Sequence, residues 1–223
     1  MQPEVITSPT RQRELELTLI YQTAQQITQL QSLSELLPRL VAEVSRTFNY
    51  SSMGVLLVDE ETNELVVRET IGLEREKHLG FRVPVTDAVE GGICGWVAYH
   101  GQSYLVPDVL ASPRYIKTVE ATRAELGVPL KIKDKVIGVL DVQSLAVNGL
   151  TERDESILST LASQIAIAVE NARLYEELAQ AQHEEWVHAK VSAARADTRP
   201  TMTTEEVRAS LQARYERLGD ASR

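Results

Sequence analysis

The stretch ELGVPLKIKDKVIGVLDVQS, residues 125 to 144, places two aliphatic runs on either side of the polar turn Lys133-Asp134-Lys135. This pattern predicts a β-hairpin. Upstream, MGVLLVD (53 to 59) and ELVVRETI (64 to 71) flank the polar turn EETN and predict a second hairpin, and LGFRVPV (79 to 85) predicts a third strand of that region. The middle of the chain is therefore predicted to be an antiparallel sheet.

Helical segments surround and interrupt this sheet. A weakly apolar periodicity predicts a helix over 11 to 31, after a proline-containing arm over 1 to 10. Ser32 and Glu35 fit the Ser-x-x-Glu pattern that caps a helix, and Thr151 with Asp154 approximates the same pattern at the start of the last long helix. The helices that follow these caps carry enough apolar residues to cover one face of the sheet.

The segment between the two hairpins has short elements of its own. GGICGWVAYHG predicts a short helix bounded by glycines, and SYLVPDV predicts a short strand stopped by Pro107. This insert also holds most of the aromatic residues of the sheet region. It can cover the second face of the sheet either around an apolar cavity with polar edges or as a filled second core, and the residues leave both possibilities open.

The last long helix has a regular alternation of four- and three-residue spacings. This alternation predicts a seam with a partner helix, and so a parallel or near-parallel homodimer. The predicted seam consists of Leu161, Ile165, Ala168, Ala172, Tyr175 and Ala179.

Composition limits the kind of protein. The chain has 223 residues, 43% of them apolar, and its net charge of -9 with scattered basic residues argues against nucleic-acid binding. One cysteine allows no disulfide within the chain, and there is no run of about 18 apolar residues that would span a membrane. We therefore expect a soluble, cytoplasmic protein without a membrane partner.

The order of these segments resembles the GAF domain family over about residues 32 to 178. The most specific matches are ELGVPL and VIGVLDVQS, followed by the helix from Leu150, and GICGWVAYHGQSYLVPDVLASPRY is similar to the family's middle segment. The resemblance implies an α+β fold. Its six-stranded antiparallel sheet would have helices on one face and a pocket-forming insert on the other, with long N- and C-terminal helices. The parts outside the domain would be an arm and helix over 1 to 31, a continuation of the C-terminal signalling helix over 179 to 195, and a polar, helical tail over 196 to 223.

The predicted pocket draws on the insert and on the two strands of the last hairpin. Its candidate ligand-binding residues are Phe81, Cys94, Trp96, Tyr104, Asp108, Tyr115, Glu125 and Asp141. The three carboxylates among them either accept hydrogen bonds from a ligand or hold loops in place. The residues name no cofactor, and the histidines are not spaced as a metal-binding pair.

Cys94 has three chemical interpretations and one structural one. Relatives that reduce free methionine sulfoxide use several cysteines, but the position expected for the attacking thiol, counted back from VPL, holds Thr118. Bilin attachment is disfavoured because Gly95-Trp96 follows the cysteine. A redox sensor at a helix N-terminus is the third interpretation. Packing as a small buried residue is the one we favour.

Together these features predict a non-catalytic sensory or regulatory module of signal transduction. We expect it to bind a small molecule, to dimerise through its terminal helices, or both, and so to control a signalling output protein. Two alternatives remain. One is a diverged free methionine sulfoxide reductase-like enzyme that uses Cys94, and the other is a purely structural dimerisation module.

Overall fold

The structure is a computed structural model that describes residues 32–50, 52–72, 75–196 and 203–220. The predicted arm and helix over 1 to 31 lie outside the described residues. The chain divides after Glu177 into two units, which are considered separately below.

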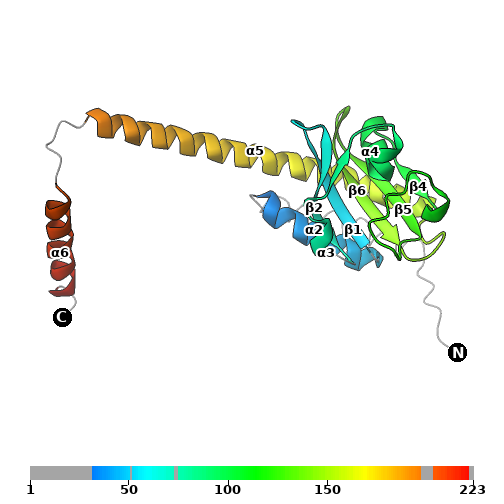
Figure 1. Ribbon diagram of the computed structural model, residues 1–223, viewed down its shortest axis with the longest axis horizontal. Coiled ribbons are helices and arrows are strands. Elements are labelled where there is room, and N and C mark those ends of the chain that lie inside the picture. Colours follow the sequence, from blue (N-terminus) through cyan, green and yellow to red (C-terminus); the bar gives the residue numbers. More distant parts are fainter. Residues whose placement is uncertain (1–31, 51, 73–74, 197–202, 221–223) are drawn as a thin grey trace. The chain divides into compact units, whose positions relative to one another are not determined.

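Six strands of the described chain form one antiparallel sheet in the first unit (Figure 1). Their spatial order is β3-β2-β1-β6-β5-β4. The fold predicted from sequence, an α+β arrangement on a six-stranded antiparallel sheet, is confirmed. The strands are β1 (Ser52–Asp59), β2 (Glu64–Ile71), β3 (Arg82–Pro84), β4 (Tyr104–Val106), β5 (Ala124–Ile132) and β6 (Lys135–Ser144).

Strand β3 is shorter than the predicted strand over 79 to 85. Gly80 has a φ of 79°, in the left-handed region that favours glycine. The Phe81 amide donates to the His78 carbonyl, so the chain turns before it becomes extended. This turn follows the four-residue helix α3 (Arg75–His78).

Helices α2 (Leu33–Phe48) and α5 (Glu152–Ala196) pack on one face of the sheet (Figure 1). Alternate residues of each strand point to this face, as the period of two requires. In β5 they are Leu126, Val128 and Leu130, and all three are buried with α2 and α5 in the main core. The stability of this unit therefore rests on a continuous aliphatic core between the helices and the sheet.

Helix α4 (Gly92–His100) packs on the opposite face, next to the short helices η1 (Val89–Gly91) and η2 (Val109–Ala111). Gly127 of β5 makes a close approach possible, because a Cβ atom there would lie 2.9 Å from Val97 Cγ2. A smaller core forms at this contact, where Cys94, Val97 and Ala98 meet Leu56 and Val139.

The two predicted helix caps have different outcomes. Thr151 and Asp154 form the predicted box, with the Thr151 amide donating to Asp154 Oδ2 at 2.9 Å and the Asp154 amide donating to Thr151 Oγ1 at 3.5 Å. The box predicted at Ser32 is wrong. The Ser32 hydroxyl pairs with the Ser34 hydroxyl instead, and the Leu33 amide donates to Glu176 of α5.

The structure corrects the predicted dimer seam. Leu161, Ile165, Ala168 and Ala172 are at most 2% exposed and belong to the core beneath the sheet of the same chain. A partner helix cannot reach them. Four-three spacing marks the buried stripe of any helix that packs on a flat surface, whether that surface is a sheet or a second helix. Tyr175 and Ala179 are exposed, and for them the seam stays a prediction.

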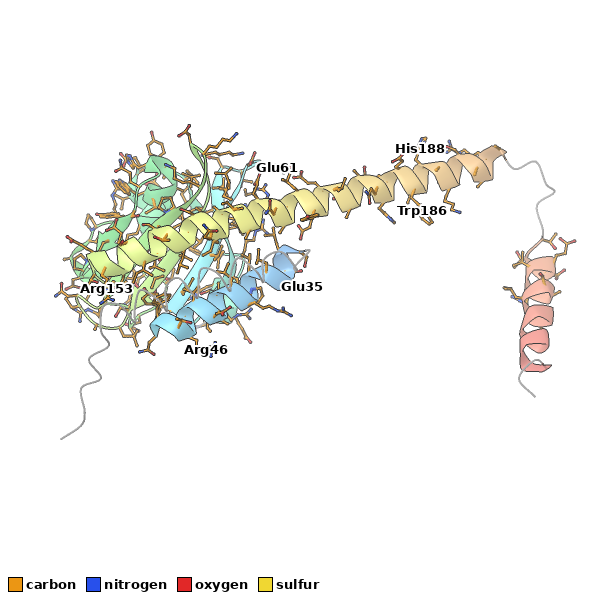
Figure 2. The ribbon with its side chains drawn as sticks, turned by 180° about the vertical axis from the view of Figure 1, so that it is seen from behind. Glu35, Arg46, Glu61, Arg153, Trp186 and His188 are labelled. Atoms are coloured by element: carbon orange, nitrogen blue, oxygen red, sulfur yellow. The ribbon has the colours of Figure 1, made fainter. Side chains whose placement is uncertain are left out.

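The second unit contains the end of α5, up to Ala196, and helix α6 (Thr204–Asp220). Along this part of α5, Trp186 is 58% exposed and His188 is also exposed, and both project from the helix surface in Figure 2. Thr203 and Glu206 cap the start of α6, with the Thr203 amide donating to Glu206 Oε2 at 2.7 Å. None of the helices in the described ranges has a segment long and apolar enough to cross a bilayer.

Candidate functional site

A cavity of about 70 Å³ lies between α4 and the sheet. Strands β1, β2, β5 and β6 form its floor, and α4 and the segment that precedes β5 form its sides. Its polar lining residues are Ser52, Thr70, His78, Cys94, Thr118, Glu125, Asp141 and Gln143. Since a water molecule needs about 10 to 15 Å³ of such space, the cavity has room for several waters or a compact polar ligand.

The sheet register explains why the cavity is hollow around Asp141. Asp141 of β6 lies opposite Gly54 of β1 on one side and opposite Gly127 of β5 on the other. Both neighbours lack a side chain, so space opens on each side of the aspartate. Glu125 and Gln143 are a directly paired couple on the same face. Strand alternation thus places two acids and an amide on the cavity floor.

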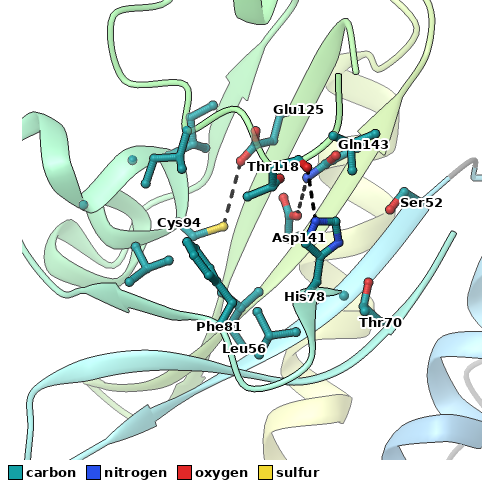
Figure 3. A pocket seen from close by; sticks show the side chains of 18 residues that line it. Ser52, Leu56, Thr70, His78, Phe81, Cys94, Thr118, Glu125, Asp141 and Gln143 are labelled. Atoms are coloured by element: carbon teal, nitrogen blue, oxygen red, sulfur yellow. Dashed lines mark hydrogen bonds between the residues drawn. The ribbon is translucent and has the colours of Figure 1, made fainter. Parts of the chain in front are cut away.

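Cys94, Glu125 and Asp141 converge in this cavity (Figure 3). One ligand-type atom from each, the Cys94 Sγ and a carboxylate oxygen from each acid, lies within 4.8 Å of the other two. The Cys94 thiol donates to Glu125 Oε1 at 3.9 Å. Glu125 is only 6% exposed, which is unusual for an acid.

A chain of hydrogen bonds orients Asp141. Thr122 Oγ1 donates to Gln143 Oε1 at 2.7 Å, and Gln143 Nε2 donates to Asp141 Oδ2 at 3.0 Å. Asp141 Oδ1 is fully buried and has no hydrogen-bond partner among the described residues. Buried polar atoms are normally satisfied, so this oxygen marks a place for a ligand, an ion or water.

Burial makes the cluster retain protons. It raises the pKa of Cys94 and the pKa of Glu125 well above their ordinary values, and the neighbouring Asp141 charge raises both further. Burial also raises the pKa of Asp141 to about 6, although the hydrogen bond from Gln143 acts in the opposite direction. Near neutral pH the thiol is therefore protonated and Asp141 is largely ionised, while Glu125 keeps its proton to a higher pH than an ordinary glutamate does.

Two segments that are far apart in sequence close the rim of the cavity. His78 Nε2, on α3, donates to the carbonyl oxygen of Thr118 at 3.2 Å (Figure 3). Helix α3 is itself held by Arg75, whose guanidinium lies 2.8 Å from Glu69 Oε1. The side chain of Phe81 lies beside this rim and remains 40% exposed.

The structure brings together four of the eight predicted pocket residues. Phe81, Cys94, Glu125 and Asp141 line the cavity. The other four lie elsewhere. Trp96 stacks on Tyr104 with ring centroids 4.8 Å apart, Tyr115 donates its hydroxyl to the Val119 carbonyl, and Asp108 caps η2 and pairs with Arg123.

The predicted apolar pocket with an aromatic wall is thus corrected to a cavity that polar and apolar residues line about equally, with Phe81 as the one predicted aromatic residue in its lining. Of the aromatic residues of α4, Tyr99 is exposed and Trp96 packs only partly buried at the edge of the smaller core, whereas Cys94 and Ala98 are buried in that core. Sequence reasoning missed Gln143, although its position two residues after Asp141 in a strand signals the same face. His78 carried no such signal, because α3 and the turn at Gly80 decide where it lies.

Comparisons with known proteins agree on the fold. A family model described as "GAF domain" matches residues 31–170. GAF domain-containing protein A of Dictyostelium discoideum is 32% identical over 126 residues, which make up 56% of this chain and 73% of that protein.

Two solved structures connect the fold with different roles. A free methionine-R-sulfoxide reductase from Neisseria meningitidis, in complex with its substrate, aligns with a TM-score of 0.65 and 25% identity over 78% of this chain and 99% of that one. A candidate GAF sensor protein from Burkholderia vietnamiensis aligns with a TM-score of 0.61 and 27% identity over 73% of this chain and 96% of that one. One likeness is to an enzyme and the other to a sensor.

Proposed function

Because the chain belongs to the GAF domain family, we propose that it is a non-catalytic regulatory module that binds a small polar molecule in the cavity between α4 and the sheet. The observation that carries the proposal is the buried, unpartnered Asp141 Oδ1 inside a cavity whose floor carries two acids and an amide. A filled second core would leave no such space, and apolar side chains would close it by packing. A bound ligand would supply the missing partner.

Helices α2 and α5 are the elements through which the bound state would be transmitted. Both pack directly on the face of the sheet opposite the cavity, and β1 and β6 contribute residues to both faces. A ligand that favours one packing of α4 and the sheet would bias the position of α5, provided that its affinity differs between the two packings. The output would be a partner signalling protein in the cytoplasm.

A homodimer is part of the same proposal, with a revised surface. Ile167 and Leu174 lie on the outer side of α5 and are 50% and 54% exposed. Their spacing of seven residues keeps them on one helix face. A second copy of the chain, packed against this face, would bury side chains that water now contacts.

Native mass spectrometry of the protein purified from its own host tests ligand binding. We expect a reproducible extra mass on the wild-type protein. Thr118→Trp should remove that mass, because the larger side chain fills the cavity, whereas Lys117→Trp, one residue earlier and exposed, should keep it. Retention of the mass in Thr118→Trp would place the ligand elsewhere and contradict the proposal.

A second function, reduction of a small sulfoxide, is favoured by one observation: the Cys94 thiol points into the cavity. Attack by the Cys94 sulfur would transfer the sulfoxide oxygen to it, giving a sulfenic acid and a thioether. Two external thiols would then regenerate Cys94, with release of water and a disulfide. Its raised pKa makes Cys94 a poor nucleophile, since the thiolate is the attacking species.

An assay with free methionine-R-sulfoxide and dithiothreitol separates the two functions. We expect no formation of methionine above the rate seen with Cys94→Ser. Turnover by the wild-type protein that Cys94→Ser abolishes would overturn the non-catalytic proposal and establish the reductase instead.

A further inference from the structure

The cluster of Cys94, Glu125 and Asp141 has the composition of a metal site. It combines one sulfur with two carboxylates, all within 4.8 Å of one another. An ion such as Zn²⁺ binds sulfur at about 2.3 Å and carboxylate oxygen at about 2.0 to 2.2 Å, so tetrahedral ligand atoms lie about 3.5 Å apart. The distance of 3.9 Å from Cys94 Sγ to Glu125 Oε1 is within a small side-chain adjustment of that value.

Two observations that are independent of the cluster's composition point to a bound cation. Asp141 Oδ1 is fully buried without a partner among the described residues, while its other oxygen is already held by Gln143. In addition, no salt bridge between described residues includes Glu125 or Asp141. Two acids close together in a buried cavity, without an ion pair to a basic side chain, form a site that a bound cation would neutralise.

We propose that Cys94, Glu125 and Asp141 bind one divalent transition-metal ion of the Zn²⁺ class, leaving an open coordination position that faces the cavity. The inference rests on the proposed function, since it takes the cavity as the place where the module binds its ligand. The mixed ligand set favours a borderline ion, because thiolate disfavours Mg²⁺ and Ca²⁺. Gln143 positions Asp141 by holding Oδ2, which leaves Oδ1 for the metal.

Metal binding must displace the protons that the cluster otherwise retains. A metal ion takes the place of the Cys94 thiol proton, which leaves to water, and it coordinates Glu125 and Asp141 as carboxylates. Because a thiol binds a metal only as thiolate, a weakly buffered solution should become more acidic when the metal is added.

Titration with Co²⁺ under anaerobic conditions tests the site directly. Because Cys94 is the only cysteine in the chain, any thiolate-to-cobalt charge-transfer band in the near ultraviolet reports on this residue alone. We expect the band to saturate at one Co²⁺ per chain and to disappear when Zn²⁺ is added. Cobalt held by exposed carboxylates would give no such band.

Two variants keep the test decisive. Cys94→Ser should abolish the band, and Asp141→Asn, which preserves shape, should weaken Co²⁺ affinity at least about tenfold while the folded state is verified by circular dichroism. Asp134→Asn, in the exposed turn between β5 and β6, is the matched control and should bind as the wild type does.

Absence of the charge-transfer band at saturating Co²⁺ and pH 8 would overturn the metal site. An extra organic mass that persists after treatment with a chelator, in a protein that gives no band, would overturn the metal site as well while leaving the proposed small-molecule function in place. A chelator-sensitive loss of both signals would support the two together.

Discussion

Glu176 of α5 accepts a hydrogen bond of 2.9 Å from the backbone amide of Leu33, the first residue of α2. The first amides of a helix have no partner within it, and a carboxylate at this end also interacts favourably with the helix dipole. Glu176 therefore caps the start of α2, where the side chain of Ser32 makes no cap hydrogen bond. It also ties the start of one covering helix to the other, across 143 residues of sequence.

Loss of this carboxylate should destabilise the domain. Glu176→Ala is expected to lower the free energy of unfolding in urea by about 1 kcal/mol, which is typical of a lost N-cap. Ser32→Ala should change it by less than about 0.5 kcal/mol, since Ser32 makes no cap bond. Glu177→Ala is the neighbouring control. The opposite ranking of Glu176 and Ser32 would show that the helix is capped locally.

The close contact of α4 with β5 should depend on Gly127. Gly127→Ala would bring a Cβ atom to 2.9 Å from Val97 Cγ2, and overpacking of this kind costs about 1 to 3 kcal/mol. The double variant Gly127→Ala with Val97→Ala removes the clashing methyl groups. It should therefore be less destabilised than the sum of the two single variants. If the double variant loses as much unfolding free energy as the two single variants lose together, the two sites do not interact.

Asp141 should make stability fall as pH rises. Its pKa of about 6 in the folded protein lies above the ordinary value of 3.8, so the folded state holds its proton more tightly than the unfolded state does. Stability is then greatest below pH 4 as far as this group is concerned, and the loss is complete above about pH 6. Without metal, Asp141→Asn should be more stable than the wild type at pH 7.5, by up to about 3 kcal/mol.

Urea unfolding at pH 4 and pH 7.5, with a chelator present, measures this difference. The advantage of Asp141→Asn should shrink toward zero at pH 4, where the wild-type carboxyl is protonated as well. Asp134→Asn repeats the same chemical change at an exposed position and should show no such trend, because water solvates that carboxylate in both states. An equal advantage at both pH values would mean that burial of the charge is not the cause.

The sequence predicted the floor of the site better than its walls. Glu125 and Asp141 lie on strands whose alternation is visible in the sequence, so their shared face follows from the strand period alone. Trp96 and Tyr104 were assigned to the pocket because they are aromatic and nearby. The position of Trp96 depends on how α4 is rotated on the sheet, where Val97 contacts Gly127, and no local pattern reveals that contact. Tyr104 begins the edge strand β4 and stacks on Trp96.

The prediction of a dimer seam from Leu161 to Ala172 was wrong for a different physical reason. The spacing from Leu161 to Ala172 is that of a buried stripe, and the sheet of the same chain buries it. A sequence period reports that a face is covered, but it does not report by what. Between Leu161 and Ala172, where the sheet covers that stripe, the outer side of α5 remains for a second chain.

The outer side of α5 should therefore control self-association. Leu174→Glu places a charge on the proposed contact twice, once from each copy of a symmetric dimer, and should raise the dimer dissociation constant at least about tenfold in sedimentation equilibrium. Leu110→Glu makes the same change at a residue that is 64% exposed on η2, and it should leave the dimer intact. If Leu174→Glu remains as dimeric as the wild type, or if the wild type is a monomer at micromolar concentrations, this face is not the contact. Transmission to a partner would then need another surface.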